Sequence, residues 1–411
     1  MKLSSYFSVV RWMAGGLLLM SALVLRADTY AYLTGVPDYS WYAGCFGTAC
    51  GNLMGHWDRH GMPNFYTGPT AGGVAPLYSC GDNVGIFSML ASKAGLDGRP
   101  ANMPGHVDDY WSSYTIDFGN CGNVSGFSYE SPYPDPFKAL GRPEHTPDCI
   151  GDFIGLSQNK WTNMAGECSG NIDAYSFVFW DKTGRRRANH YTTNTTGQYI
   201  PDVGSGLQQW ARYRGYDADV FTQLTSFNPE RTTTNGFTYE DVQAEINAGY
   251  PVLCFLQPTT EFHRSIGPMT NANPDIHGVM IYGLYSDASL AKGVLIRTSW
   301  GSGDGYIMDW SLNNWLGLFP VRGVIGFHPK PKVTQMSHAN GQFSLAWDAP
   351  DAQLYNVLTG TTTDLHAYVV ERSATLNPPN FLPIATNTTH SITLPDGGGA
   401  SAFFRVRLTR R

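Results

Sequence analysis

Residues 39–61, YSWYAGCFGTACGNLMGHWDRHG, form the stretch around which the rest of the fold is expected to be organised. Three apolar side chains recur at helical spacing and predict a helix with one apolar face: Leu53, Met54 and Trp57. Polar side chains occupy other positions of the same helix: Asn52, His56, Asp58 and Arg59. Thr48 is expected to cap the first turn, and Gly61 is expected to end the last one.

A cysteine preceded by glycine, Cys45, stands just before this predicted helix. A thiol at a helix start lies near unpaired backbone N–H groups and the positive end of the helix dipole. Both favour the thiolate, which is the nucleophilic form. Cys45 could instead be half of a disulfide or a small buried side chain. Cys50 is a competing nucleophile, but it is expected to lie a full turn inside the helix.

Length and composition describe an ordinary globular chain. With 411 residues, 42% of them hydrophobic and 15% charged, the chain can hold two or three domains and bury a large core. A net charge of −6 and the lack of any basic run longer than residues 185–187 give no indication of nucleic-acid binding.

Residues 1–27 are interpreted as a signal peptide. Lys2 and Arg11 form a basic start, and the apolar run over 13–25 is shorter than the roughly 20 residues that span a bilayer. Cleavage is expected after Ala27, with a retained membrane anchor as the alternative. We therefore expect a secreted or periplasmic protein that is not an integral membrane protein after signal removal.

Export also affects how the seven cysteines are interpreted. An odd number in an oxidising compartment leaves at least one free thiol. One nucleophile and three disulfides satisfy the count. Cys254, in the apolar run PVLCFL, could equally be a buried free thiol, which leaves two disulfides and two free cysteines.

Predicted helices precede predicted strands over residues 28–329. Helical spacing and stop glycines predict helices over 83–94, 207–214 and 238–249, and Thr238 with Asp241 resembles a capping box. Short β-rich runs predict strands over 251–257, 277–285, 293–300, 303–310 and 323–328. This order is typical of an α+β fold with an antiparallel sheet. After a linker over 329–333, alternating strands predict a small all-β sandwich over 334–411, similar to a fibronectin type III domain, with Trp347 in its core.

Two further motifs follow far along the chain from Cys45. His277 heads the strand HGVMIYGLY, where Gly278 permits close backbone approach, and Thr298 opens TSWG at the end of the next strand. A cysteine at a helix start, a His-Gly strand start and a polar-x-Trp-Gly strand end occur in this order in papain-superfamily cysteine peptidases. Over about residues 37–328 the chain is most similar to the bacterial branch related to bacteriocin-leader-processing (double-glycine) peptidases. GCFGTACGNLMGHWDRHG resembles the nucleophile segment there, with Gly47 and His56 as departures, and AEINAGYPVL resembles a second segment.

The resemblance implies a papain-like fold, with a helical layer against an antiparallel sheet, and roles for four residues. Cys45 is expected to be the nucleophile, and His277 the general base and then acid. Thr298 occupies the position of the Asn or Asp that orients the histidine, unless Asp304 substitutes for it. Tyr39 stands where the oxyanion-holding glutamine is expected, so its hydroxyl is a candidate donor alongside the Cys45 N–H.

Two hypotheses follow. In the first, the protein is an exported cysteine peptidase that cleaves a peptide or protein substrate, while the sandwich positions it on a surface polymer or partner. In the second, the papain-like scaffold is catalytically impaired and acts as a secreted binding or adhesion protein. Related acyl transfer uses the same pair of residues. No metal or other cofactor is expected, because the motif with His106, Asp108 and Asp109 lacks a partner cluster and is interpreted as a hydrogen-bonded corner.

Overall fold

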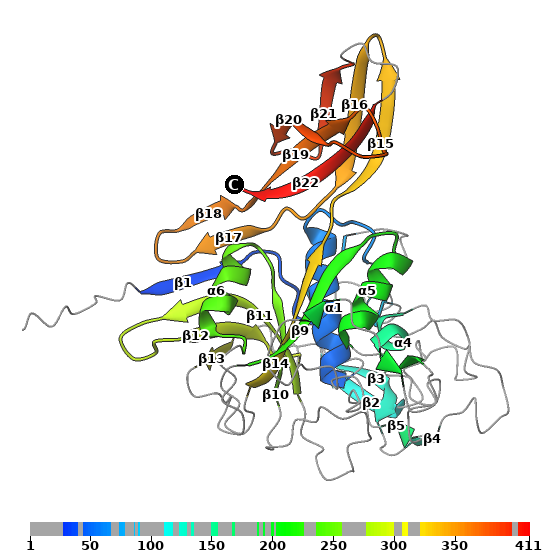
Figure 1. The fold of residues 1–411 in the computed structure, drawn as a ribbon. Coiled ribbons are helices and arrows are strands. Elements are labelled where there is room, and N and C mark those ends of the chain that lie inside the picture. The colour runs from blue at the N-terminus through cyan, green and yellow to red at the C-terminus, as the bar shows by residue number, and fades with distance from the viewer. Residues whose placement is uncertain are drawn as a thin grey trace, which may run out of the picture.

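The computed structural model describes residues 28–39, 44–66, 74–78, 86, 89–90, 111–117, 123–129, 133–134, 149–154, 167–168, 187–188, 192–193, 199–200, 203–225, 236–256, 277–299, 306–310, 321–396 and 402–411. Figure 1 shows one large sheet with helices beside it, and two smaller sheets that extend away from it towards the C-terminus. The predicted signal peptide, most of the helix over 83–94 and the motif at 106–109 lie outside the described residues.

A ten-stranded sheet forms the main body. Its strand order is β18 (Thr361–Asp364), β17 (Gln353–Asn356), β1 (Thr29–Leu33), β11 (His277–Ser286), β10 (Val252–Leu256), β14 (Val321–Pro329), β9 (Ala218–Leu224) and β6 (Arg187–Ala188); β12 (Gly293–Arg297) pairs with β11, and β13 (Tyr306–Asp309) pairs with β12. The pairing is antiparallel throughout. The five strands predicted between residues 251 and 328 are thereby confirmed.

Strand β11 is shared by two parts of this sheet. Its residues 277–281 pair with β10, and its residues 283–286 pair with β1. Its other edge pairs with β12. The four apolar residues of β12 are buried in succession, which fits a strand covered on both faces better than one with a solvated face.

Helix α1 (Gly44–Arg59) runs through the core. Its predicted apolar face is fully buried: Leu53, Met54 and Trp57. Asn52 and His56 are fully buried as well, which an amphipathic pattern does not predict. Figure 1 shows why, because α1 lies between the main sheet and α4 and α5, and its C-terminal end meets the β-rich C-terminal part of the chain.

The two ends of α1 were predicted with different success. Thr48 lies inside the helix and is fully buried, so the prediction that it caps the first turn is wrong. Gly61 does end the helix: its φ is 81°, and the Met62 N–H donates to the Trp57 carbonyl at 3.0 Å. Glycine tolerates this left-handed conformation because it has no Cβ.

Two buried polar side chains of α1 bind the chain on either side of it. The Asn52 Oδ1 accepts a hydrogen bond from the Tyr39 N–H at 2.9 Å. The two carboxylate oxygens of Asp58 accept from the N–H groups of Tyr66 and Ala75, each at 2.9 Å. Burial raises the pKa of Asp58, and these two bonds counteract part of that rise. Asn52 and Asp58 therefore anchor flanking segments instead of facing water.

The other described helices are α4 (Ile150–Ile154), α5 (Val203–Tyr213) and α6 (Tyr239–Asn247). The capping box of α6 is confirmed. The Thr238 Oγ1 accepts from the Asp241 N–H at 3.2 Å, and the Asp241 Oδ2 accepts from the Thr238 N–H at 2.9 Å. Gly249, with φ of 86°, follows the end of the helix as predicted.

The C-terminal module consists of two three-stranded sheets: β15 (Lys332–Ala339), β16 (Gln342–Asp348) and β21 (Ser391–Pro395) in one, and β20 (Leu382–Asn387), β19 (His366–Ser373) and β22 (Phe403–Arg410) in the other. Between them lies a core of Leu345, Trp347, Ala349, Tyr368 and Val370. Trp347 is 2% exposed, which confirms its predicted place in this core.

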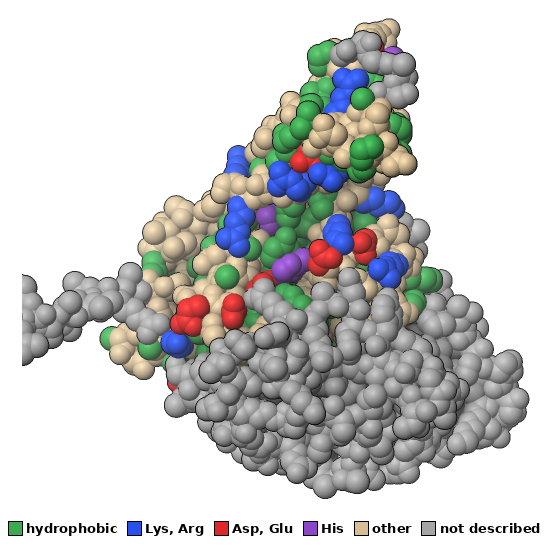
Figure 2. Space-filling view, viewed as in Figure 1, with side chains coloured by type: hydrophobic (Ala, Val, Ile, Leu, Met, Phe, Trp, Pro, Cys, Tyr) green, Lys and Arg blue, Asp and Glu red, His purple; other side chains and the backbone are tan. Residues whose placement is uncertain are grey.

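The module is joined to the main sheet more closely than the predicted boundary at 329–334 implies. The hairpin β17–β18, from the segment predicted to be sandwich, pairs with β1 of the main sheet. The predicted linker is short, since β14 ends at Pro329 and β15 begins at Lys332. Lys330 between them forms ion pairs with Asp217 and Asp219, at 3.0 and 2.7 Å. Figure 2 shows basic and acidic side chains gathered where the main body meets the C-terminal module.

Three small two-stranded sheets complete the described elements: β2 (Trp111–Asp117) with β3 (Asn123–Tyr129), β4 (Tyr133–Pro134) with β5 (Glu167–Cys168), and β7 (Thr192–Thr193) with β8 (Tyr199–Ile200). The chain therefore has a mixed fold rich in antiparallel strands. A papain-like layer of helices stays a prediction. No helix in the described ranges is long and apolar enough to cross a membrane.

Candidate active site

Cys45 lies in the first turn of α1, which begins at Gly44. The first four N–H groups of a helix have no partner within the helix, so the Cys45 N–H is one of them. No acidic residue lies in the first turn of α1 to compensate the positive end of its dipole. The backbone position therefore has the electrostatics expected of a nucleophile site.

His277 is the first residue of β11, and its backbone pairs with that of Leu256 in β10. The next residue, Gly278, meets α1 directly. A Cβ placed on Gly278 would lie 2.6 Å from Cδ1 of Phe46, closer than real Cβ contacts. Phe46 follows Cys45, and Gly278 follows His277, so the neighbours of the two predicted catalytic residues are in contact.

A third segment reaches the same glycine. Ser299, in the turn after β12, is fully buried, and its hydroxyl donates to the Gly278 carbonyl at 2.9 Å. Thr298, the predicted third member, precedes it and is 1% exposed. The three predicted motifs therefore converge at one place. We call it the junction and define it by Phe46, Gly278, Thr298 and Ser299; the side chains of Cys45 and His277, and the whole of Asp304, lie outside the described residues.

Tyr39 does not lie at the junction. The Tyr39 hydroxyl donates to the Pro76 carbonyl at 2.9 Å. A Cβ placed on Gly55 would lie 2.5 Å from the Tyr39 hydroxyl oxygen, so this hydroxyl lies beside Gly55 of α1. The helical rise puts Gly55 about 15 Å from Cys45 along the axis of α1. The expected oxyanion role of Tyr39 is therefore corrected. Its hydroxyl proton is already donated to Pro76, at a part of α1 that is far from Cys45.

The two other cysteines weighed from the sequence are both buried. Cys50 lies inside α1 and is fully buried. Cys254, in β10, is 1% exposed and is a free thiol, which confirms the buried free thiol expected at this residue, while the number of disulfides stays a prediction. Burial raises the pKa of the Cys254 thiol well above its usual range. Cys254 is therefore kept as the protonated thiol, which is less reactive than the thiolate.

Arg297 ties the chain before α1 to the strand that leads into the junction. Its guanidinium donates to the Val36 carbonyl at 3.1 Å and lies 3.8 Å from the Asp38 carboxylate. Its Cζ also stands 4.6 Å from the centre of the Tyr282 ring, in a cation–π contact. The residue before Thr298 is thus fixed by three groups, and none of these contacts was predicted from the sequence.

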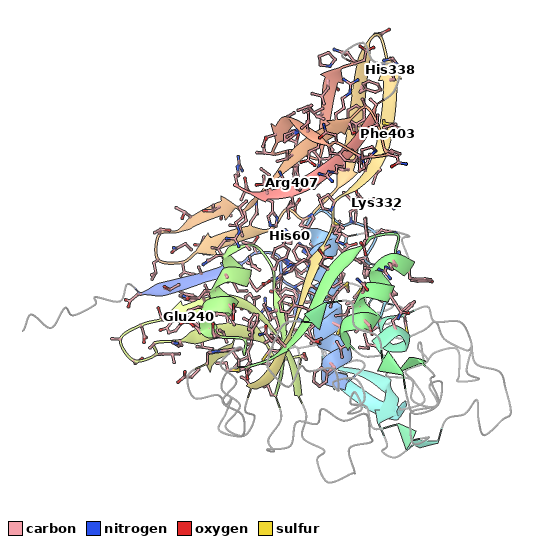
Figure 3. The ribbon with its side chains drawn as sticks, viewed as in Figure 1. His60, Glu240, Lys332, His338, Phe403 and Arg407 are labelled. Atoms are coloured by element: carbon pink, nitrogen blue, oxygen red, sulfur yellow. The ribbon has the colours of Figure 1, made fainter. Side chains whose placement is uncertain are left out.

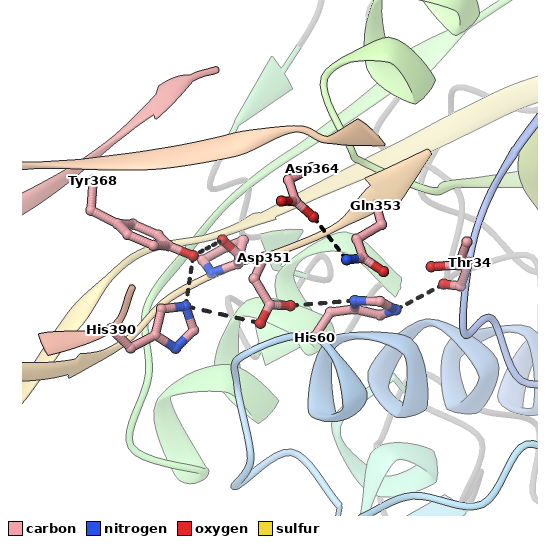
Figure 4. Close-up of polar contacts among 8 residues, drawn as sticks. Thr34, His60, Asp351, Gln353, Asp364, Tyr368 and His390 are labelled. Carbon is pink, nitrogen blue, oxygen red and sulfur yellow. Dashed lines mark hydrogen bonds and ion pairs between the residues drawn. The ribbon is translucent and has the colours of Figure 1, made fainter. Parts of the chain in front are cut away.

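The opposite end of α1 meets the C-terminal module at a second polar cluster (Figures 3 and 4). The His60 Nε2 donates to the Thr34 carbonyl at 2.8 Å, and its Nδ1 lies 3.3 Å from Asp351. The His390 Nε2 lies 4.0 Å from Asp351 and 2.6 Å from the Tyr368 hydroxyl. We call this cluster the seam. It was not predicted from the sequence, because its residues come from segments far apart in the chain.

No family model, curated protein or solved structure matches this chain. Within the described ranges, no group of three or more His, Cys, Asp or Glu residues is placed to hold a metal ion. The chemistry that the junction can perform therefore has to be argued from its own residues.

Proposed function

We propose that the protein is an exported cysteine peptidase in which Cys45 is the nucleophile and His277 the general base. The contact of Phe46 with Gly278 carries this proposal, because it brings the first turn of α1 to the start of β11. Segments far apart in the sequence are thereby brought together. Phe46, which follows Cys45, contacts Gly278, which follows His277. An isolated cysteine and an isolated histidine have no reason to meet in this way.

The proposed reaction separates one difficult hydrolysis into two easier steps. The Cys45 thiolate attacks the carbonyl carbon of a peptide bond, and the imidazolium of His277 protonates the leaving amine. A water molecule, deprotonated by the now neutral imidazole, then attacks the acyl-enzyme and releases the acid. The thiolate leaves, and the proton held by the histidine restores the starting ion pair.

Two groups support this chemistry in the proposal. The Cys45 N–H, unpaired within the helix, is available to stabilise the oxyanion. In this proposal the Thr298 hydroxyl accepts a hydrogen bond from the imidazole and so sets its tautomer. Because a hydroxyl carries no charge, it stabilises the imidazolium less than the usual acid does, and turnover is expected to be slow.

The substrate proposed for this site is an extended peptide bound between the start of α1 and the main sheet. Because residues 1–27 are predicted to be a signal peptide, we expect the reaction to take place outside the cytoplasm. The C-terminal module remains the candidate for contact with a surface polymer or partner, and its hairpin in the main sheet supports a second role in holding the enzyme together.

A thiol-directed epoxide inhibitor tests the proposal. We expect labelling at Cys45 alone, located by peptide mass spectrometry, with the rate reduced at least tenfold by His277→Ala. Cys50→Ser and Cys254→Ser are matched controls, because both thiols are buried, and both variants should label like the wild type. A Cys45 that is oxidised in a disulfide, or a labelling rate that does not depend on His277, contradicts the peptidase and favours a secreted binding scaffold.

A further inference from the structure

A buried serine at the junction has an unusual backbone conformation. Ser299 has φ of 66° and is fully buried. A residue with a Cβ rarely adopts positive φ, because the Cβ approaches the backbone carbonyl. Among the described non-glycine residues, only Asn340 shares this conformation, and it lies in an exposed turn of the C-terminal module. Asparagine is a usual occupant of such a turn, whereas a buried serine needs another explanation.

The β11–β12 ladder supplies that explanation. Met280 is paired with Arg297, so two residues further along each strand Ser299 stands opposite Gly278. In a regular ladder, the Ser299 N–H would donate to the Gly278 carbonyl at this step. The ladder instead ends at Met280 and Arg297, and the Ser299 hydroxyl donates to that carbonyl at 2.9 Å. The side chain has taken the place of the backbone donor.

Gly278 is therefore held by two contacts, one with Phe46 and one with Ser299. The Phe46 ring lies against its Cα, and the Ser299 hydroxyl binds its carbonyl. On its third side, the Gly278 backbone pairs with Phe255 of β10. The residue that follows His277 is therefore fixed relative to the first turn of α1 and to the turn that carries Thr298.

We propose that Ser299 is a positioning residue, which holds the start of β11 so that His277 forms its ion pair with Cys45. This inference rests on the proposed peptidase function. The hydroxyl acts only through Gly278 and does not touch the reacting atoms. Without it, the buried Gly278 carbonyl loses this donor, and the start of β11 can shift relative to α1. Small displacements of this kind reduce rates strongly, because catalytic groups must stay in near-attack geometry.

Two substitutions separate the hydroxyl from the backbone conformation. Ser299→Gly keeps the left-handed conformation without strain but removes the hydroxyl, and Ser299→Ala removes the hydroxyl and keeps the Cβ. Asn340→Gly is the matched control, because it removes a side chain from the same backbone conformation far from the junction. The rate of Cys45 alkylation by iodoacetamide is measured from pH 5 to pH 10 in the full chain, and thermal unfolding checks that each variant is folded.

We expect both Ser299 variants to react about tenfold more slowly than the wild type at pH 6, which is the effect of one buried hydrogen bond. Their rates should converge with the wild-type rate at the alkaline end, where the thiolate forms without help from the histidine. Asn340→Gly should follow the wild type throughout. A Ser299→Gly profile identical to that of the wild type overturns the positioning role and leaves the peptidase intact. If the wild type and His277→Ala are alkylated at the same rate, both proposals are rejected together.

Discussion

The two ends of α1 make contacts of opposite character. At the N-terminal end, the contact is apolar: the Phe46 ring lies against Gly278 of β11. At the C-terminal end, the contact is polar and involves the C-terminal module. The Ala349 N–H donates to the Gly61 carbonyl at 3.0 Å, and His60 lies 3.3 Å from Asp351. One helix therefore connects the junction to the seam.

The difference shows what each end does for the molecule. At the apolar end, close approach excludes water, and the proposed ion pair between Cys45 and His277 would therefore be strong there. At the polar end, the N–H groups of Ala349 and Asp351 bind the carbonyls of Gly61 and His60, in the turn that follows the helix. Together with the β17–β18 hairpin, this makes the C-terminal module a structural partner of the main sheet, in addition to any surface that it recognises.

The largest effect is expected at the polar end, from Gly61→Ala. A Cβ on Gly61 would lie 1.9 Å from the Ala349 carbonyl oxygen, and φ there is 81°. The substitution combines a left-handed backbone with a clash against main chain, so we expect the free energy of unfolding to fall by about 3 kcal/mol or more. Urea unfolding followed by tryptophan fluorescence measures the loss.

Gly341→Ala is the matched control for this substitution. Gly341 has φ of 70°, but a Cβ there meets no atom within 4 Å. Its free energy of unfolding should fall by only about 1 kcal/mol, which is the cost of placing a Cβ in the left-handed backbone conformation. Equal losses in the two variants would show that Gly61 and Ala349 can separate to accommodate a Cβ and that the seam does not constrain α1.

A smaller loss of stability, with a larger loss of reactivity, is expected at the apolar end from Gly278→Ala. The added Cβ would overlap the Phe46 ring, and such overpacking lowers the free energy of unfolding by about 2 kcal/mol. Because Phe46 is buried and belongs to the first turn of α1, we expect the overlap to displace that turn and to slow epoxide labelling of Cys45 more than tenfold. Phe46→Ala removes the overlap, so the double variant should lose about 1 kcal/mol less than the sum of the single losses in a double-mutant cycle. Strict additivity would mean that the ring and the glycine are not in contact.

Signals that lie close together in the sequence predicted structure well. The α6 helix was predicted from Thr238, Asp241 and Gly249, which act within a few residues of one another, and each performs its expected role. The strands from β10 to β14 were found from short β-rich runs for the same reason. A cap or a strand is decided mainly by its own residues, so one sequence is enough to locate it.

Features that depend on distant partners could not be predicted. The β17–β18 hairpin resembles the sandwich strands around it, and only its register with β1 places it in the main sheet. Tyr39 is near Cys45 in sequence, but its hydroxyl is bound at Pro76. At the junction, Gly278 was recognised as a point of close approach, whereas its two contacts, Phe46 and Ser299, were not. Which side chain fills the space above a glycine is decided by packing between elements.

The smallest expected effect concerns the pH dependence of stability at the polar end, where His56 is buried beside the seam. Neither ring nitrogen of His56 has a hydrogen-bond partner among the described residues. Burial lowers its pKa well below the ordinary value of 6.5, with smaller contributions from His60, His366 and Arg59. The native state therefore keeps His56 neutral at a pH where the unfolded chain binds a proton.

Stability contributed by the neutral form of His56 is complete above pH 6.5 and is lost as the pH falls below it. We expect His56→Leu, which sacrifices no described hydrogen bond, to reduce the slope of unfolding free energy against pH between 6 and 5 by about 1.4 kcal/mol per pH unit, the value for one proton. Urea titrations at each pH measure the slope. Met54→Leu, another fully buried change in α1, should shift the free energy without changing its slope. If His56→Leu and the wild type keep the same slope, then water reaches His56 in the native state, and the polar end of α1 is hydrated where the apolar end is not.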